Sequence, residues 1–261
     1  MEVLRYIKRK KKPRVFKYIK KKRKGHPLHF TLIDPDKQMP EKAAEIAERA
    51  KRFGSDAIMV GGSHPTQAMY LDDCVKAIKA KVELPVILFP SAHSGISAYA
   101  DAIFFMSLLN SKSPQYIVEE QMKGAVLVKN YKLEPLPMAY LIVDSGETTS
   151  AAWMGDVRPI PREKPEFAVG YALAAKYFGM RFVYLEAGSG AKQPVPDEMI
   201  KTVKHSIEPE MLLVVGGGIR DGKTAREKVK AGADIIVTGT VAEGKDESKL
   251  MEVIQAVRGK K

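Results

Sequence analysis

Three strand-to-loop junctions in the last third of the chain decide its fold: FVYLEAGSGA at 182–191, LVVGGGIRD at 213–221 and IIVTGT at 235–240. Each is a short apolar segment that ends at glycine and precedes a helix-like segment. Backbone N–H groups exposed at such strand ends, beside helix N-termini, bind phosphate groups. In a barrel of alternating strands and helices, the loops after the last two strands are the usual phosphate site. The junctions therefore predict a barrel that handles a small phosphorylated molecule.

The same alternation of strands and helices extends through most of the chain. Strands are expected near residues 28–33, 57–60, 86–89, 102–105, 138–143, 182–186, 212–216 and 235–238. Helices are expected near residues 40–53, 69–80, 115–123, 166–178, 197–207, 221–231 and 246–257. This order predicts an α/β protein, a single (β/α)8 TIM barrel, for which 261 residues and 45% hydrophobic content are sufficient.

The net charge of +12 is concentrated at the N-terminus. Residues 1–24 hold thirteen of the 43 Lys and Arg residues and one of the 31 acids, so the rest of the chain is neutral. We divide the chain into a basic N-terminal segment, residues 1–24, with a short helix over 14–23 beneath the barrel, and a catalytic TIM-barrel domain, residues 25–261. The neutral body argues against nucleic acid as a partner.

The basic segment has two readings. It is a flexible, solvated tail, or it makes transient contact with an anionic membrane surface. In the second case, four apolar side chains would add shallow insertion: Val3, Leu4, Tyr6 and Ile7. The single cysteine, Cys74, excludes an internal disulfide, and no apolar run reaches the roughly 18 residues of a membrane span. We expect a cytoplasmic protein, peripheral at the membrane if the segment docks there.

Oxygen-bearing side chains follow the first two expected strands. Asp34 comes directly after the first strand, and Ser63 follows Gly61 and Gly62 after the second. A carboxylate and a hydroxyl at one rim suit Mg²⁺, which keeps several waters and takes further ligands from phosphates. The alternative is that Asp34 only caps a turn before Pro35.

Glu186 lies inside the first glycine-rich junction. A carboxylate beside phosphate loops cannot hold phosphate, because the charges repel, and it suits accepting a proton from a hydroxyl group. Tyr184 faces the same side of the strand, where it takes part in the site or packs in the core.

The connection 144–165 is long for a compact barrel and contains the only tryptophan, Trp153. Such loops form lids or interfaces, or they are solvated excursions. We expect a homo-oligomer in which a neighbouring subunit buries Trp153; the alternative is a lid over its own active site. Four basic residues have two interpretations, as ligands of a diphosphate or as ordinary solvated charges: Lys37, Arg158, Arg162 and Lys164.

Together these motifs resemble the geranylgeranylglyceryl phosphate synthase family, which is related to the bacterial heptaprenylglyceryl phosphate synthases. The shared motifs stand in family order: DPDK at 34–37, GGS at 61–63, YLEAGSG at 184–190, GGGI at 216–219, Gly239-Thr240 and the loop from Gly155 to Arg162. The resemblance covers residues from about 14 to 257. The long loop and the EAGSG version resemble the branch found mainly in archaea.

The resemblance implies a Mg²⁺-dependent prenyltransferase. Such an enzyme joins sn-glycerol 1-phosphate to geranylgeranyl diphosphate, releases diphosphate and forms the first ether bond of archaeal lipids. By position it implies Mg²⁺ on Asp34 and Ser63, with Glu186 and Tyr184 as catalytic residues. The implied glycerol phosphate site consists of Tyr184, Leu185, Glu186, Ala187, Gly188, Ser189, Gly190, Gly217, Gly218, Gly239 and Thr240.

A prenyl chain needs a long apolar groove. The candidates lie near the ends of the fourth and fifth strands, where they line the groove or form ordinary core: Phe104, Phe105, Met106, Leu108, Leu109, Met138 and Tyr140. Two rival functions stay open. One is an isomerase or aldolase of a phosphorylated metabolite, although an aldolase needs a strand lysine that the expected strands lack. The other is a non-catalytic protein that binds anionic lipid or nucleic acid.

Overall fold

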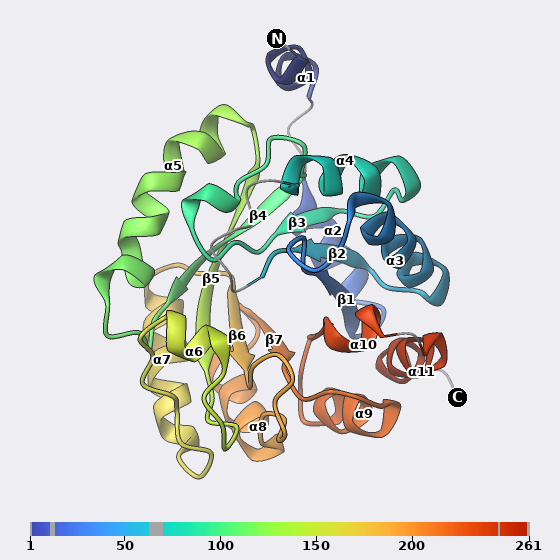
Figure 1. The fold of residues 1–261 in the computed structure, drawn as a ribbon. Coiled ribbons are helices and arrows are strands. Elements are labelled where there is room, and N and C mark those ends of the chain that lie inside the picture. Colours follow the sequence, from blue (N-terminus) through green and yellow to red (C-terminus); the bar gives the residue numbers. More distant parts are fainter. Residues whose placement is uncertain (1, 11–13, 63–69, 245, 260–261) are drawn as a thin grey trace.

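Eight parallel strands close into a barrel in sequence order in the computed structural model, which describes residues 2–10, 14–62, 70–244 and 246–259 (Figure 1). The strands are β1 Leu28–Ile33, β2 Ala57–Val60, β3 Val86–Leu88, β4 Ala102–Leu108, β5 Glu134–Ile142, β6 Phe182–Glu186, β7 Leu212–Gly216 and β8 Ile235–Thr238. The expected (β/α)8 barrel is therefore confirmed.

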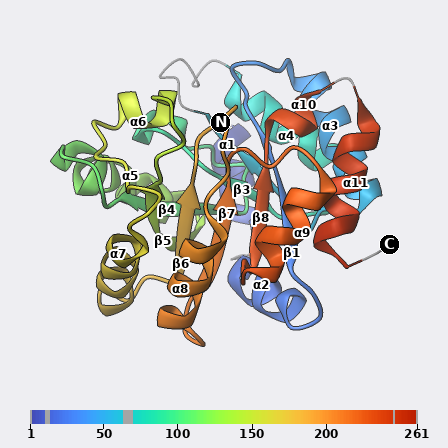
Figure 2. The same cartoon turned by 90° about the horizontal axis from the view of Figure 1, so that it is seen from below.

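Helices cover the outside of the barrel, as Figure 2 shows for α8, α9 and α11 over β6–β8. The main helices are α3 Pro40–Phe53, α4 Leu71–Lys81, α5 Glu120–Asn130, α7 Pro165–Tyr177, α8 Asp197–Ile207, α9 Gly222–Lys230 and α11 Glu247–Val257. Short helices follow two strands: α6 Ser150–Met154 and α10 Thr240–Glu243. Within the part of the chain that the structure describes, every helix is too short or too polar to cross a lipid bilayer.

Side chains of each strand alternate between the barrel interior and the layer under the helices. In β6, Phe182 and Tyr184 pack in the interior cluster, whereas Val183 and Leu185 pack against the helices. Glu186 is next in the inward series, so the last residue of β6 points into the barrel mouth. The strand register sets Glu186 beside Gly216 of β7.

Two strands are longer than the sequence pattern predicts. β5 begins at Glu134 rather than at residue 138, and β4 continues to Leu108 rather than ending at 105. Pro135 and Pro137 sit in β5 without breaking it, because a proline still offers its carbonyl: Arg181 N–H donates to Pro137 O at 2.9 Å. The helix expected at 115–123 starts as a π-helical turn, η2 Gln115–Glu119, and runs on as α5.

Residues 89–101 connect β3 to β4 without an α-helix. They form only the three-residue turn η1 His93–Gly95. Gly and Ser in this segment disfavour a helix, as its composition suggested. The ring of helices therefore has a gap between α4 and α5.

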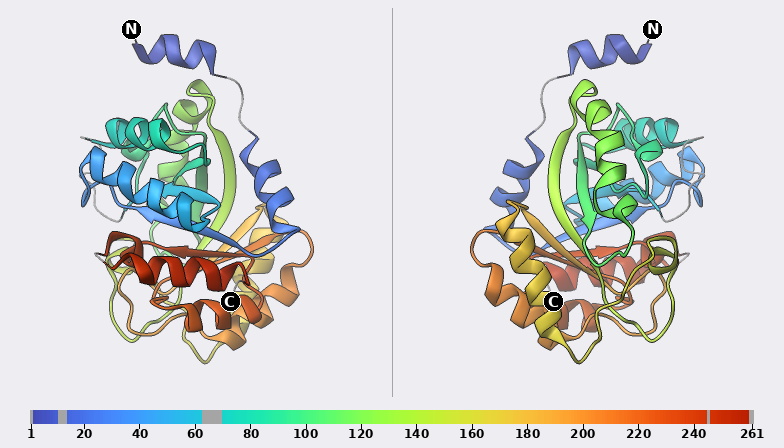
Figure 3. Two further views of the ribbon diagram at one scale, coloured as in Figure 1. Left: turned by 90° about the vertical axis from the view of Figure 1, so that its right-hand side faces the viewer. Right: turned by 90° about the vertical axis from the view of Figure 1, so that its left-hand side faces the viewer.

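The basic N-terminal segment forms two helices, α1 Glu2–Arg9 and α2 Val15–Arg23. α2 is the helix expected over 14–23, and it closes the lower end of the barrel with the buried side chains of Val15 and Ile19 (Figure 3). α1 was not expected from the sequence. Figure 1 shows it end-on outside the barrel, between α4 and α5. The division of the chain at residue 24 stays a prediction.

Candidate active site

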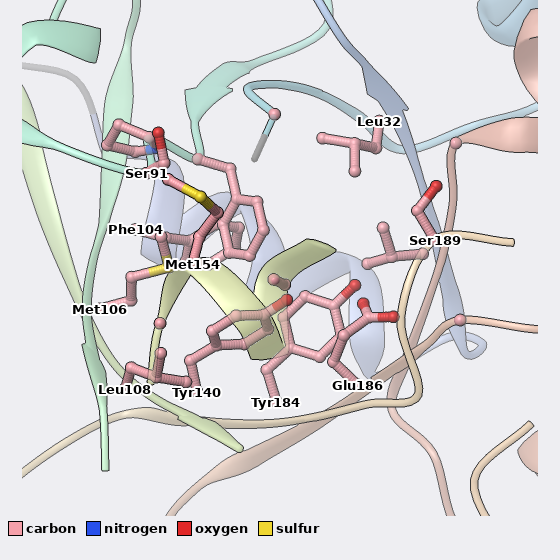
Figure 4. A pocket seen from close by; sticks show the side chains of 18 of the residues that line it. Leu32, Ser91, Phe104, Met106, Leu108, Tyr140, Met154, Tyr184, Glu186 and Ser189 are labelled. Atoms are coloured by element: carbon pink, nitrogen blue, oxygen red, sulfur yellow. The ribbon is translucent and has the colours of Figure 1, made fainter. Parts of the chain in front are cut away.

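Glu186 and Tyr184 form a buried pair at the C-terminal rim of the barrel. Figure 4 shows the Tyr184 hydroxyl beside the Glu186 carboxylate, with Tyr140 next to them. Tyr184 hydrogen-bonds to the carboxylate, and the backbone N–H of Gly188 donates to Glu186 Oε1 at 2.6 Å. A side chain at Gly216 would clash with this pair, because its Cβ would lie 2.3 Å from Tyr184 Oη. The glycine in β7 therefore leaves room for the pair in β6.

The protonation of this pair follows from its burial. Desolvation raises the pKa of the Glu186 carboxyl, and the hydrogen bonds from Tyr184 and Gly188 oppose that rise. Burial and the nearby carboxylate also raise the pKa of the Tyr184 and Tyr140 phenols. Both phenols therefore stay neutral, and Glu186 is the carboxyl of this group whose raised pKa favours taking up a proton.

Glycines with positive φ shape the loops after β6 and β7. Their φ angles are +104° at Gly188, +74° at Gly190, +81° at Gly217 and +71° at Gly218. Successive residues in such conformations turn backbone N–H groups toward one point, which makes an anion site. Together with the Gly239-Thr240 turn after β8, we call residues 187–191, 217–221 and 239–240 the phosphate loops.

The phosphate loops are tied to each other. Ser189 Oγ lies 3.4 Å from Thr240 Oγ1, and Arg220 Nη2 donates to the carbonyls of Gly190 and Ala191 at 2.8 and 2.9 Å. Arg220 was not singled out from the sequence, although it directly follows the glycine run. Its guanidinium places a positive charge at the wall of the pocket.

Most of the predicted glycerol phosphate residues line one pocket: Tyr184, Glu186, Ser189, Gly190, Gly217, Gly218, Gly239 and Thr240. Leu185 and Ala187 do not, because their side chains pack under the helices. The N–H groups of Ala187 and Gly188 are used within the protein, on Gly216 O and on Glu186. Gly188 is also absent from the pocket lining, and its carbonyl accepts the Ala191 N–H at 3.2 Å.

The same pocket continues as an apolar groove into the gap left by the missing helix. β4, the 89–101 segment and α5 form its walls, and we call this part the apolar groove. Five of the predicted prenyl-binding residues line it: Phe104, Phe105, Met106, Leu108 and Tyr140. Met138 is instead buried in the barrel core, and Leu109 packs under the helices.

The groove narrows where Gly124 of α5 meets the 89–101 segment. A Cβ at Gly124 would lie 2.8 Å from Ile96 Cδ1. Nearby, His93 Nδ1 is 2.7 Å from Glu120 Oε2. Burial raises the pKa of Glu120, but hydrogen bonds from His93 and Lys123 outweigh it and lower that pKa to about 2. The sequence pointed to none of these residues, because the segment and α5 meet only in the fold.

The long connection 144–165 roofs the pocket through α6. Ala151, Met154 and Gly155 line the pocket, and Thr149 packs where a Gly188 side chain would stand. Trp153 points away, with 77% of its surface exposed. The connection thus lies over the pocket of its own chain, as the lid alternative expects, but through neighbours of Trp153 and not through the indole.

Asp34 lies beside the pocket at the end of β1. Its Oδ1 accepts the N–H of Asp36 at 3.1 Å, so it does cap the turn, and its Oδ2 is 3.3 Å from Lys37 Nζ. A Cβ at Gly62, which lines the pocket, would lie 2.5 Å from Asp34 Oδ1. Ser63 lies outside the described residues.

Asp34 and its neighbours fit a cation that takes its remaining ligands from substrate oxygens. Glu243 lies 3.9 Å from the same Lys37 Nζ, and burial, with Asp34 nearby, raises its pKa even though Lys37 lowers it. The described residues contain no group of three or more His, Cys, Asp or Glu side chains arranged around a metal. A cage built by the protein alone is absent there, whereas Mg²⁺ typically uses one or two carboxylates plus phosphates.

The predicted basic candidates lie outside the pocket wall. Arg162 donates to Asp144 O and Pro194 O, and Lys164 pairs with Glu166 at 3.6 Å. Arg158 is exposed. Of the four, only Lys37 lies near a site residue, through its contact with Asp34.

Phosphate loops, a buried carboxylate and an apolar groove meet in one pocket at the rim of the barrel. They define a barrel enzyme that acts on a phosphorylated molecule with an apolar partner. The model of the PcrB family matches residues 17–257. The geranylgeranylglyceryl phosphate synthase of Pyrococcus furiosus is 58% identical over 230 residues, which cover 88% of this chain and 90% of that protein. This chain belongs to the PcrB family, as do those synthases.

Other comparisons agree. The geranylgeranylglyceryl phosphate synthase of Thermococcus kodakarensis is 56% identical over 247 residues, 93% of this chain and 96% of that protein. The crystal structure of (S)-3-O-geranylgeranylglyceryl phosphate synthase from Thermoplasma acidophilum, in complex with sn-glycerol-1-phosphate, matches with a TM-score of 0.87 and 43% identity over 92% of this chain and 97% of that one. Mycobacterium tuberculosis tryptophan synthase, at 14% identity and a TM-score of 0.59, shares the fold alone.

Proposed function

We propose that this protein is a Mg²⁺-dependent prenyltransferase that joins sn-glycerol 1-phosphate to geranylgeranyl diphosphate. The products are geranylgeranylglyceryl phosphate, with the first ether bond of archaeal lipids, and diphosphate. The observation that carries the proposal is the position of Glu186, where the phosphate loops meet the apolar groove. Family membership supports the choice of substrates.

The two substrates would occupy the two parts of the pocket. The phosphate group of glycerol phosphate lies against the phosphate loops, whose backbone and Arg220 favour an anion. The prenyl chain lies in the apolar groove, where each buried CH₂ contributes about 0.8 kcal/mol. Holding both at one rim supplies proximity.

The reaction breaks one bond and forms another. The glycerol hydroxyl oxygen attacks C1 of the prenyl chain, and the bond from C1 to the diphosphate oxygen breaks, so the electron pair leaves with diphosphate. Glu186 accepts the hydroxyl proton, and its raised pKa makes it a stronger base than an exposed carboxylate. Tyr184 and the Gly188 N–H hold the carboxylate in place.

Asp34 is the residue we propose to hold Mg²⁺, with Ser63 as the second ligand that the resemblance implies. When bound, the cation would stabilise negative charge on the departing diphosphate. Lys37 is placed to add positive charge beside Asp34.

Product formation tests the proposal directly. The purified protein is incubated with both substrates and Mg²⁺, and the product is identified by its mass. We expect geranylgeranylglyceryl phosphate and diphosphate in equal amounts. Absence of product under these conditions, with a correctly folded protein, would overturn the proposal.

Asp34→Asn tests the metal assignment. A neutral amide is a poorer ligand for a hard cation, so the Mg²⁺ concentration that gives half-maximal activity should rise. Asp73→Asn, at an exposed position of α4, is the matched control and should leave the dependence of activity on Mg²⁺ concentration unchanged. Identical curves for Asp34→Asn and the unchanged protein would remove Asp34 from the metal site.

An aldolase is disfavoured by the same strands. No lysine occurs in β1–β8, so a Schiff-base lysine of the usual strand type is absent from them. A location in the cytoplasm stays a prediction.

We also propose a homo-oligomer in which Trp153 is an anchor. An indole with 77% of its surface exposed on a short helix is unusual unless a partner covers it. Light scattering after size exclusion should give a smaller mass for Trp153→Ala than for Phe178→Ala, which removes an equally exposed aromatic side chain on another face. Equal masses for both variants and the unchanged protein would exclude the anchor role.

A further inference from the structure

Helix α1 is attached to the segment that precedes β4 and to the end of α5. Tyr6 Oη donates to Tyr99 O at 3.2 Å, and the two rings lie 4.9 Å apart. Lys10 Nζ donates to three backbone carbonyls at the foot of β4 and the end of α5, those of Ala98, Ala100 and Tyr131. These contacts hold α1 at the gap in the ring of helices.

The apolar side of α1 is used inside the protein. Val3 and Tyr6 are partly buried against an outer cluster that includes Ile103, and Ile96 and Phe105 of the groove pack against the same cluster. Val3 and Tyr6 are therefore not free to insert into a membrane, contrary to the expectation from the sequence. α1 lies outside the barrel between α4 and α5, where the ring of helices has its gap (Figure 1).

The opposite side of α1 is cationic and exposed. Arg5 and Lys8 are solvent-exposed, and Leu4 between Val3 and Arg5 keeps 66% of its surface exposed. Lys132, at the end of α5, and Lys76, which lies 4.4 Å from the centre of the Tyr99 ring, add positive charge close by. Lys76 is itself paired with Asp73 at 3.6 Å and lies near Glu2, and the neighbouring acid Asp101 is paired with Lys79. Among the described residues no ion pair involves Arg5 or Lys8, so these two side chains carry the positive charge of the face.

We propose that the outer face of α1, formed by Leu4, Arg5 and Lys8, is a docking surface for an anionic lipid bilayer. Its charge complements anionic headgroups, and one exposed leucine permits shallow contact without a large insertion. Because α1 is attached to the 89–101 segment, part of which lines the groove, docking there brings that side of the barrel next to the bilayer. The reason for docking rests on the proposed prenyl substrate, which partitions into membranes.

A vesicle experiment without turnover tests this surface. The full chain is co-sedimented with phosphatidylglycerol-containing vesicles and with pure phosphatidylcholine vesicles, at low and rising salt. We expect binding to the anionic vesicles only, and release as salt shortens the screening length. The double variant Arg5→Glu/Lys8→Glu should lose at least ten-fold in binding. It leaves Tyr6 and Lys10 in place, so α1 stays attached.

The matched control carries the same charge change elsewhere. Lys51→Glu/Lys249→Glu alters two exposed lysines on α3 and α11 and should retain binding. Equal loss in both double variants would show that only net charge matters and would overturn the proposal. So would equal binding to both kinds of vesicle, or tighter binding to a DNA duplex that displaces the protein from vesicles. Since no product is measured, failure here leaves the prenyl transfer proposal intact.

Discussion

The phosphate loops and the apolar groove are two halves of one pocket, but backbone atoms line the first half and side chains line the second. The phosphate loops are backbone, with glycines at positive φ and few side chains. The groove is side chains from β4, the 89–101 segment and α5. The first half is fixed by local sequence, and the second by contacts between distant segments. Substitutions should therefore affect each substrate separately, unless they fall on the residue between the halves.

Glu186→Gln should have the largest effect, because Glu186 stands where the halves meet. Loss of a positioned proton acceptor typically costs on the order of 10²–10⁴ in rate. The amide oxygen can still accept the Gly188 N–H, so the fold and both KM values should change little. In the unchanged enzyme, activity should fall as the pH drops through the raised Glu186 pKa.

The control for Glu186 is Tyr184→Phe, which keeps the ring contacts with Phe89 and Tyr140. It should lose less rate than Glu186→Gln. Near-normal turnover of Glu186→Gln in steady-state assays would remove Glu186 from the mechanism and leave the two halves without a shared catalytic group.

Gly217→Ala should damage the phosphate half most, although the added methyl group also meets the Glu186 carboxylate. Its φ of +81° disfavours any side chain, and a Cβ would lie 2.4 Å from Glu186 Oε1 and 2.6 Å from Gly188 N. We expect a loss of about 1–3 kcal/mol, the usual cost of such strain, in glycerol phosphate binding. Gly170→Ala in α7 has open space and should be neutral or slightly stabilising. Isothermal titration with glycerol phosphate distinguishes the two.

Gly124→Leu should damage only the groove half. The added side chain fills the narrow point beside Ile96, which would displace a few CH₂ groups of a long prenyl chain at about 0.8 kcal/mol each. The KM for geranylgeranyl diphosphate should rise about ten-fold, with less effect on a ten-carbon diphosphate and none on glycerol phosphate. If the KM of both prenyl substrates changed equally, the narrow point would not be part of the chain-binding path.

The smallest effect on activity is expected at His29, which governs acid stability beneath the phosphate half. His29 is buried, its Nε2 lies 2.9 Å from Thr238 Oγ1 just before the Gly239 turn, and desolvation lowers its pKa from 6.5 to about 3. Below pH 6.5 the His29 imidazole is protonated in the unfolded chain but stays neutral in the folded chain. The free energy of unfolding should then fall by about 1.4 kcal/mol for each pH unit, until about pH 3.

Denaturant unfolding at pH 7 and pH 5 measures this slope. The free energy of unfolding of His29→Gln should change less between the two pH values than that of the unchanged protein. His205→Gln, at an exposed position, should keep the original slope. The same slope in His29→Gln would mean that other groups carry the acid sensitivity.

Sequence patterns predicted the barrel and the glycine loops at its rim, because both depend on local features; phosphate binding by those loops stays a prediction. Alternating apolar strands and a glycine run such as Gly216-Gly217-Gly218 are visible without knowing what they touch. Arg220 could have been found, since it follows that run and is a cation among phosphate loops. Leu185 and Ala187 were included only because they lie between motif residues, whereas strand alternation turns their side chains outward.

The groove and α1 were less predictable for a physical reason. Ile96, Glu120 and Gly124 line the pocket only because the chain omits a helix after β3, and an omitted helix leaves no motif. The charge of residues 1–13 left two readings, a solvated tail or a membrane-docking segment, and neither included a helix packed on the barrel. The burial of Tyr6 and Lys10 depends on carbonyls that no local pattern reveals.

The attachment of α1 also has a consequence for the order of assembly during synthesis. Its hydrogen bonds join residues that are 88 to 121 positions apart. The helix leaves the ribosome well before Tyr131, and its binding place is complete only after Tyr131 has emerged. During that interval a cationic, amphipathic segment is unattached, and its apolar side chains have no partner. Residues that are made early are thus fixed late, and a nascent chain offers them to any anionic surface nearby.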